Sequence, residues 1–396
     1  MVSTRSRPGV GAATIEHGSS KPNRKRRVGF VVTVAVVAGA LTLRWMHTLD
    51  WSFVDLVDFV EGGRSVLSGR QVYDAIPGVL PFNYPPFGAV VMAPLALVGL
   101  GAAETLWTLL SLAAYGVLVV VVARRLRLDR TSTAVIAIAG LALEPLIRHL
   151  VLGQVNLVLA ALVVLDLFVV PRRYRGIVIG IAAGVKLTPA VFAVQFLLKR
   201  DWASAVRSLL TFIATIALGW LVAPASSSRY WLEDLDKTAR FGGDALMSAN
   251  QSLRAVVVRA TSLENPPLMW WAPLAGLALT LCVWVAARRI RAADDVGAML
   301  ALALGGLLAS PISWSHHWVW VVPAIMYAVA ARRLAMAWVV AGVFYVAPMW
   351  LLPAGGAELR LYAWQVAVSA TYVVVGLVLL LILGQRNGGS PVGMPR

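Results

Sequence analysis

Residues 103–123 read AETLWTLLSLAAYGVLVVVVA and are followed at once by Arg124 and Arg125. Within this stretch the only charged side chain is that of Glu104, close to its start. A helix needs about 20 predominantly apolar residues to cross the hydrocarbon core of a bilayer. The stretch therefore predicts a membrane-spanning helix that ends at a basic pair.

The same pattern recurs along the whole chain. The other long candidates are 28–48, 131–150, 152–170, 205–224, 269–288, 334–352 and 363–384, and shorter or broken ones are 86–100, 176–198, 295–310 and 316–331. By the length rule this predicts an all-α polytopic membrane protein with about 11 or 12 membrane segments. Composition agrees, because 59% of the residues are hydrophobic and only 14% are charged, whereas soluble domains carry about 25% charged residues.

The net charge of +16 comes mainly from short basic runs at the ends of the apolar stretches. Such runs mark the cytoplasmic side of a membrane protein, and their placement argues against nucleic-acid binding, which uses one basic face or patch. By this rule the two long loops, 49–85 and 225–268, lie outside the cytoplasm.

Three parts of the chain differ in composition. Residues 1–27 are polar and basic, and we expect a disordered cytoplasmic tail there. The apolar stretch that follows has no small-residue cleavage site after it, so we expect a retained span. Residues 28–385 then form a single transmembrane domain, and residues 386–396 form a short C-terminal tail.

A lone lysine, Lys186, interrupts the apolar stretch 176–198 and is bracketed by Gly184 and Pro189. Because a charge at membrane depth is costly, such a residue usually faces a cavity or a partner. We expect two half-helices that rise and return, with Lys186 near the outer turn, where it can neutralise a phosphate. The alternative is that its flexible stem carries the ammonium group to the membrane interface.

Two carboxylates follow the first span in the run Phe53-Val54-Asp55-Leu56-Val57-Asp58-Phe59. Asp55 and Asp58 are three residues apart and would share one face of a helix. A partly shielded carboxylate at the membrane surface can take a proton from an acceptor hydroxyl as a general base. Both carboxylates could equally be solvated residues at a helix end, and spacing alone leaves the two interpretations open.

Polar groups also interrupt the apolar sequence around residue 150. Glu144 and Arg148 precede Gly153-Gln154-Val155-Asn156. Arg148 is suited to bind phosphate, and Gln154 and Asn156 to bind sugar hydroxyls. The alternative is a Glu144–Arg148 ion pair with ordinary hydrogen bonds between helices.

Three further blocks fall on the same outer side. Tyr84 lies in the proline-rich run 82–87, Asn250 and Gln251 lie in the loop 225–268, and His316 and His317 are flanked by tryptophans. Aromatic residues of this kind also occur simply as a belt at the membrane interface. Adjacent histidines point in different directions on a helix, so we do not expect a shared metal ion. Convergence of these blocks favours a membrane-embedded pocket with a carboxylate, cations and polar donors, which suits a phosphate-bearing lipid donor.

The order of these blocks resembles that of a known family. The matching blocks are Phe53-Val54-Asp55-Leu56 with Gly62, Phe82-Asn83-Tyr84-Pro85-Pro86-Phe87, Glu144-Pro145, Gly153-Gln154-Val155-Asn156, Gly184-Val185-Lys186-Leu187-Thr188-Pro189, Asn250-Gln251-Ser252 and Ser310 through Trp320. Over residues 50 to 325 the chain is similar to glycosyltransferase family 87, and within it to mycobacterial polyprenyl-phosphate-mannose-dependent α-1,2-mannosyltransferases.

This resemblance implies a type C glycosyltransferase fold in the cell membrane, with the active site on the extracytoplasmic face. It implies a polyprenyl-phosphate-mannose donor, a glycolipid acceptor such as a phosphatidylinositol mannoside or lipomannan, inversion at the transferred sugar, and neither metal nor cofactor. The family's catalytic aspartate corresponds to Asp55, and the chain departs from the family where Val57, Asp58 and Phe59 follow, which leaves Asp58 as the alternative base.

The remaining roles are assigned as hypotheses on these grounds. We expect the donor phosphate to be bound by Lys186, His317, His316 and Arg148. We expect sugar or acceptor hydroxyls to be bound by Gln154, Asn156, Asn250, Gln251 and Tyr84. The competing hypotheses are a transporter or flippase for a lipid-linked sugar, and an enzyme that transfers arabinose instead of mannose.

Overall fold

The computed structural model describes residues 31–40, 52–234 and 246–385. The predicted tails 1–27 and 386–396, most of the first predicted span and part of the loop 225–268 lie outside the described residues. The described chain is built from helices, and its only β-type contact is a single bridge between Asn250 and Trp314. The predicted all-α fold is therefore confirmed.

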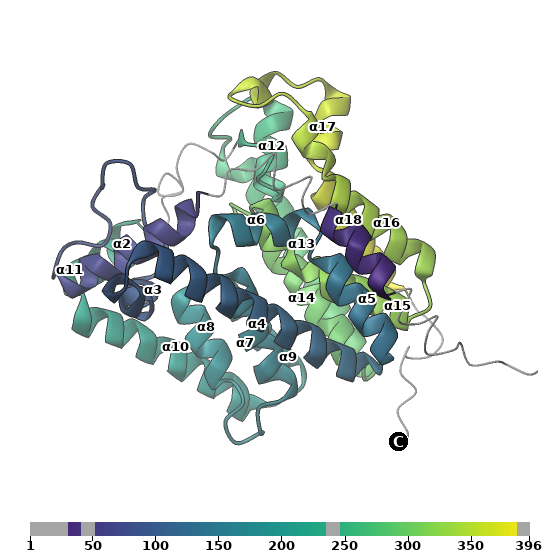
Figure 1. Ribbon diagram of the computed structural model, residues 1–396, viewed down its shortest axis with the longest axis horizontal. Coiled ribbons are helices and arrows are strands. Elements are labelled where there is room, and N and C mark those ends of the chain that lie inside the picture. The colour runs from purple at the N-terminus through teal and green to yellow at the C-terminus, as the bar shows by residue number, and fades with distance from the viewer. Residues whose placement is uncertain (1–30, 41–51, 235–245, 386–396) are drawn as a thin grey trace, which may run out of the picture.

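Long apolar helices form the framework of the molecule (Figure 1). Those long enough to cross a membrane unaided are α4 (Leu100–Leu126), α10 (Trp202–Val222), α13 (Leu268–Arg291) and α16 with η7 (Leu334–Val346 and Pro348–Leu351). Two bent pairs bring the number of candidate spans from four to six: α5 with α6 (Arg130–Gly140 and Glu144–Leu152, 58°) and α17 with α18 (Ala363–Ser369 and Thr371–Gly384, 67°).

The other predicted segments are shorter helices. They are α3 with η1 (Pro86–Met92 and Ala93–Leu97), α7 (Asn156–Phe168), α8 (Ile177–Val185), η2 with α9 (Thr188–Phe192 and Ala193–Leu198), α14 (Asp295–Ala309) and η6 with α15 (Ser315–Trp320 and Val321–Ala330). A straight helix that crosses the hydrocarbon core needs about 17 residues or more. The figure of 11 or 12 segments thus stays a prediction, although the described segments coincide in position with apolar helices.

The chain breaks at Lys186, as the flanking residues predict. Helix α8 ends at Val185, Lys186 has extended backbone angles (φ −149°, ψ 133°), and Pro189 lies in the first turn of η2. Proline is tolerated there because the first N–H groups of a helix have no intrahelical acceptor. At this break the Lys186 side chain reaches Asn156 and His317, which belong to other elements.

Helices on the polar side of the molecule are short. They are α2 (Val54–Leu67), α11 (Pro224–Ser228), η3 (Arg229–Asp234), α12 (Leu253–Thr261) and η8 (Ala357–Arg360). In Figure 1, α2, α3 and α11 lie together at one end of α10, and α12 lies beside α17. Within the described residues, the loops predicted to carry function therefore contain short helices that pack onto the membrane framework.

Two glycines allow α2 to approach its neighbours closely. A Cβ atom on Gly62 would lie 2.6 Å from the ring of Phe82, and one on Gly153 would lie 2.6 Å from the Cβ atom of Leu56. Gly153 also has a positive φ of 72°, which glycine adopts without steric cost. These contacts fix the start of α2, where Asp55 lies, against the end of α6.

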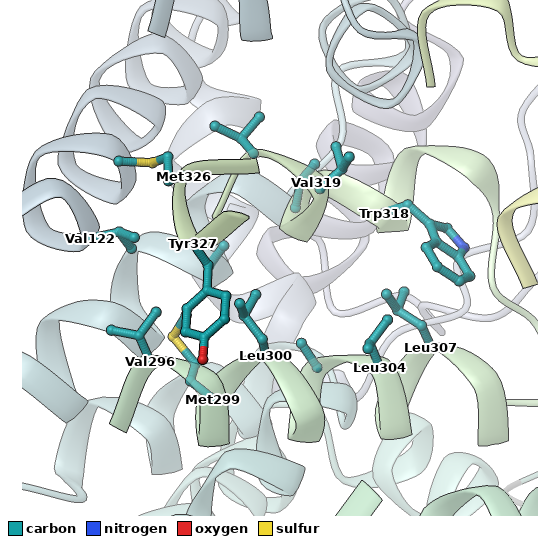
Figure 2. Packing of buried hydrophobic residues seen from close by; sticks show 14 of the residues in the cluster. Val122, Val296, Met299, Leu300, Leu304, Leu307, Trp318, Val319, Met326 and Tyr327 are labelled. Carbon is teal, nitrogen blue, oxygen red and sulfur yellow. The ribbon is translucent and has the colours of Figure 1, made fainter. Parts of the chain in front are cut away.

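The main core lies around α14. Its buried side chains, among them Met299 and Leu302, pack against η6 and α15, where Val319, Val322 and Met326 are buried. Figure 2 shows this packing from close by. Because η6 carries His316 and His317, packing of η6 against this core fixes the position of the histidine pair.

Candidate active site

Both predicted carboxylates lie in the first two turns of α2. The helix starts from Phe53, whose left-handed backbone (φ 44°) directs its N–H to the carbonyl oxygen of Val151 at 3.1 Å. Asp55 follows in the first turn and is half-buried, whereas Asp58 is only 5% exposed. The structure thus places both carboxylates on one helix beside the end of α6.

Burial changes the acidity of both groups. It raises the pKa of Asp55 above its ordinary value, although a hydrogen bond with the Gln154 side chain and the charges of Lys186 and Arg148 oppose the rise. Burial, together with the neighbouring charge of Asp55, raises the pKa of Asp58 to about 8. At neutral pH, Asp58 is therefore largely protonated, and Asp55 is the carboxylate that cations stabilise in its ionised form.

Lys186 is the centre of the cationic side of the site. Its Nζ atom donates a hydrogen bond to Asn156 Oδ1 at 2.9 Å and lies 3.1 Å from His317 Nε2. The same atom lies 5.2 Å from the ring centroid of Tyr84. Four segments that are distant in the sequence thus meet at one ammonium group.

Gln154 connects this cation to the carboxylate. Its side chain lies beside Asp55, and its Oε1 atom accepts from Tyr84 OH at 3.2 Å and from Asn156 Nδ2 at 3.4 Å. Trp107 Nε1 holds the backbone carbonyl of Gln154 at 3.2 Å. The polar network therefore runs from Asp55 through Gln154 and Asn156 to Lys186.

Several buried polar nitrogen atoms beside this network have no protein partner within the described residues: Arg148 Nε, His316 Nε2 and both ring nitrogens of His149. The rings of His316 and His317 meet edge to face, with centroids 4.8 Å apart. Buried polar groups are almost always hydrogen-bonded in native proteins. Unused donors at this place therefore indicate that a ligand completes the site.

His149 is a residue to which the sequence analysis gave no role. It is fully buried and lies near Lys186, His316 and His317. The cost of burying a polar ring applies to it as it does to its neighbour Arg148. The position of His149 within an apolar stretch could therefore have marked it as a site residue from the sequence.

Glu144 does not form the ion pair with Arg148 that was the structural alternative for this motif. Its carboxylate is fully buried and accepts from Ser315 Oγ at 2.7 Å, Trp350 Nε1 at 2.8 Å and Tyr372 OH at 2.9 Å. The Arg148 guanidinium instead lies 4.9 Å from the ring centroid of Trp350. Glu144 thereby fastens η6, and with it the histidine pair, to α6, η7 and α18.

Asn250 and Gln251 lie outside the network around Lys186 and bind protein backbone. Asn250 Oδ1 accepts from the Ser313 N–H at 2.9 Å. Gln251 Nε2 donates to the carbonyl oxygens of Ser248 and Ser369, both at 2.6 Å, and its Oε1 atom accepts from the Tyr372 N–H at 3.1 Å. Both side chains are fully buried, and these contacts hold the segment that leads into η6.

A small cavity of about 50 Å³ adjoins the polar network. Asn156, His317 and Ser313 line its polar side, and Pro189, Phe192 and Leu307 are among the residues of its apolar side. A phosphate bound by Lys186 would therefore meet apolar surface directly beside it. In the described part of the chain, no three histidine, cysteine or carboxylate side chains group closely enough to hold a metal ion.

A polytopic helical fold with a carboxylate, basic side chains and an adjoining apolar cavity is suited to binding a lipid phosphate within the membrane. The model of glycosyltransferase family 87 matches residues 82–311. The chain belongs to this family, and it is an integral membrane glycosyltransferase with the type C fold.

Curated relatives cover most of the chain. It is 33% identical over 365 residues to the polyprenol-phosphate-mannose-dependent α-(1-2)-phosphatidylinositol mannoside mannosyltransferase of Mycobacterium tuberculosis, with 84% of each chain covered. It is 32% identical over 412 residues to the enzyme of the same description from Mycolicibacterium smegmatis, covering 92% of this chain and 93% of the relative. A phosphatidylinositol pentamannoside mannosyltransferase of M. smegmatis is 34% identical over 334 residues, with 80% of each chain covered. No solved structure matches the chain.

Proposed function

We propose that this protein transfers mannose from polyprenyl-phosphate-mannose to a phosphatidylinositol mannoside and forms an α-1,2 linkage. The names of the curated relatives support this donor and this class of acceptor. The observation that carries the proposal is the network that joins Asp55 through Gln154 and Asn156 to Lys186 and His317. This network has a carboxylate at one end and an ammonium group at the other, which supports the proposed base and the proposed phosphate-binding cation.

The reaction is a single displacement. Asp55 takes the proton of the acceptor hydroxyl, and the oxygen attacks the anomeric carbon on the face opposite the phosphate. The bond between that carbon and the phosphate oxygen breaks, and its electron pair leaves with polyprenyl phosphate. One displacement inverts the anomeric centre, so a β-linked donor gives an α-linked product.

The leaving phosphate gains a negative charge as the bond breaks. We assign its stabilisation to Lys186 and His317, with Arg148 and His316 beside them, because preorganised cations and hydrogen-bond donors act most strongly where charge develops. The unpartnered donors of Arg148 and His316 support this assignment. The small cavity beside His317 would take the first isoprenoid units of the donor.

The polar side chains divide into two groups. Gln154, Asn156 and Tyr84 belong to the network and are proposed to bind sugar or acceptor hydroxyls. Asn250 and Gln251 are proposed to position η6 instead, because their described contacts go to the backbone. The distribution of basic runs supports an active site on the extracytoplasmic face of the cell membrane, within the single domain 28–385.

The test looks for the new glycosidic bond that a transferase must form. Detergent-purified protein is incubated with polyprenyl-phosphate-mannose and a phosphatidylinositol mannoside, and mass spectrometry with linkage-specific mannosidase digestion identifies the product. We expect a product one mannose larger with an α-1,2 linkage, and none when the acceptor is omitted. Movement of the donor across a vesicle membrane without any new glycosidic bond would establish a flippase, and transfer from an arabinose donor alone would overturn the choice of sugar.

A further inference from the structure

A second, larger cavity lies between α14, α15, α16 and α18. Its volume is about 270 Å³, close to the lower end of the ~300–1,000 Å³ of ligand pockets. Leu300, Leu304 and Leu307 of α14 form one wall, and Phe344 of α16 and Leu379 of α18 are among the residues opposite. Figure 2 shows the three leucines on one side of α14, facing the segment that carries Trp318 and Tyr327.

This cavity extends from the candidate active site along α15 toward the basic residues at the far end of that helix. One end lies at Trp318 and Trp320, which follow His317 directly, and the other lies at Tyr327, Ala331 and Arg333. Helix α15 connects the two ends with 10 residues, or about 15 Å at 1.5 Å per residue. This is about half of the ~30 Å hydrocarbon core, so the length of the cavity matches that of one leaflet.

Two arginines line the end away from the active site, and they differ in their partners. Arg289 donates to the carbonyl oxygen of Leu383, and its guanidinium lies 3.5 Å from Asp294 Oδ2. Asp294 also accepts from Tyr327 OH at 2.5 Å, so this local group is electrically balanced. Arg333 is half-buried and pairs with no carboxylate of the described chain.

We propose that this cavity is a binding site for one anionic phospholipid of the leaflet opposite the active site. A fatty-acyl chain packs against the leucine wall, and the phosphate of the head group binds Arg333. Apolar walls of an unfilled cavity lose dispersion contacts on one side, and an acyl chain restores them. Lipid phosphates next to basic residues at a membrane surface are attracted electrostatically.

The polyprenyl donor is a poorer occupant of this cavity. Its phosphate is proposed to bind Lys186, beyond the end of the cavity that lies away from Arg333, and Trp318, only 2% exposed, together with Trp320 forms the end nearest that site. Arg333 would then be left without an anion. An anionic lipid uses both the apolar wall and the unpaired arginine.

Native mass spectrometry of the detergent-purified protein provides the test. The protein is titrated with phosphatidylglycerol and, separately, with phosphatidylcholine of the same chains. We expect one bound lipid with a preference of about fivefold for phosphatidylglycerol, the effect of roughly one basic residue near the head group. Arg333→Gln should abolish the preference, whereas Arg332→Gln, at the exposed neighbouring position, should keep it.

A second variant tests the apolar wall. Leu304→Phe adds volume inside the cavity and should reduce binding of both lipids, provided that size exclusion and thermal unfolding show an intact fold. Equal losses in Arg332→Gln and Arg333→Gln would overturn the proposal in favour of a diffuse surface attraction. Unchanged binding in Leu304→Phe, or displacement of the lipid by polyprenyl phosphate alone, would overturn it as well.

Discussion

Replacing Lys186 with methionine removes one positive charge and keeps the length of the side chain. In the described structure this ammonium group has two near neighbours, Asn156 Oδ1 at 2.9 Å and His317 Nε2 at 3.1 Å. An ammonium group has three donors, so a third remains for a phosphate oxygen. The substitution should therefore weaken stabilisation of the leaving group without removing the base.

The magnitude follows from Coulomb's law. Two unit charges about 4 Å apart interact by about 4 kcal/mol at an effective dielectric constant of ~20. The leaving phosphate gains one charge over the whole reaction, and about half of it at the transition state, so the barrier should rise by about 2 kcal/mol. Since each ~1.4 kcal/mol is a factor of ten, we expect Lys186→Met to lower kcat by about 30-fold.

The assay is transfer of labelled mannose to a phosphatidylinositol mannoside, with kcat and the KM for the donor measured separately. The matched control is Lys199→Met, because Lys199 forms a surface ion pair with Asp295 at the other end of the same broken segment. The control should transfer mannose at the wild-type rate. The electrostatic assignment is refuted if correctly folded Lys186→Met keeps the kcat of the wild type, or if both variants lose it equally.

Four further predictions concern the carboxylates and the packing of α2. The transfer rate should fall as pH is lowered through the raised pKa of Asp55, because only the ionised carboxylate accepts a proton, and a plot of kcat/KM against pH measures this. Because the pKa of Asp58 is raised to about 8 in the fold, the folded state binds more protons than the unfolded one between pH ~4 and ~8, so stability falls as pH rises. Asp58→Asn should then raise the unfolding midpoint at pH 8 more than at pH 5, and equal shifts would contradict the burial argument. Glu144→Gln replaces charge-assisted hydrogen bonds by neutral ones and should lower the free energy of unfolding by about 1–3 kcal/mol, with a higher donor KM because η6 is less well held. Gly153→Ala should lower both stability and kcat, whereas Gly116→Ala in α4, where nothing lies within 4 Å of the added Cβ atom, should leave kcat unchanged and should not lower stability.

The broken segment and the meeting of the polar blocks were predictable from sequence. Lys186 lies between a glycine and a proline, and the cost of a buried charge demands a partner or a cavity wherever the lysine occurs. The same cost argument applied to Gln154, Asn156 and His317, which the structure brings to Lys186. The local sequence was enough to predict these residues as site candidates, because each one is a polar residue within an apolar stretch.

The supporting contacts were not predictable in this way. Glu144 finds its partners 171, 206 and 228 residues further along the chain, in three different elements. Nothing near Glu144 in the sequence distinguishes such a set from the ion pair with Arg148 that helical spacing favours. Likewise, Asn250 and Gln251 look like free polar residues of a loop, and only the fold shows that backbone groups of residues 313 and 369 use them.

The bends within two predicted spans have a related cause. Hydropathy predicts a single continuous helix over 131–150 and another over 363–384, because apolar composition carries no information on where a helix bends. In the structure, Pro145 starts a new helix after a break at residues 141–143, and the second pair bends at Ala370. The first bend puts Glu144, Arg148 and His149 beside the site.

The most direct measurement compares single-turnover mannose transfer by Asp55→Asn, Asp58→Asn and the wild type at saturating donor and acceptor. Loss of a general base lowers the rate by about 100-fold or more, and we expect that loss in Asp55→Asn alone, with donor affinity retained and Asp58→Asn close to the wild-type rate. Transfer by Asp55→Asn at the wild-type rate, or a loss confined to Asp58→Asn, would contradict the assignment of Asp55 as the base.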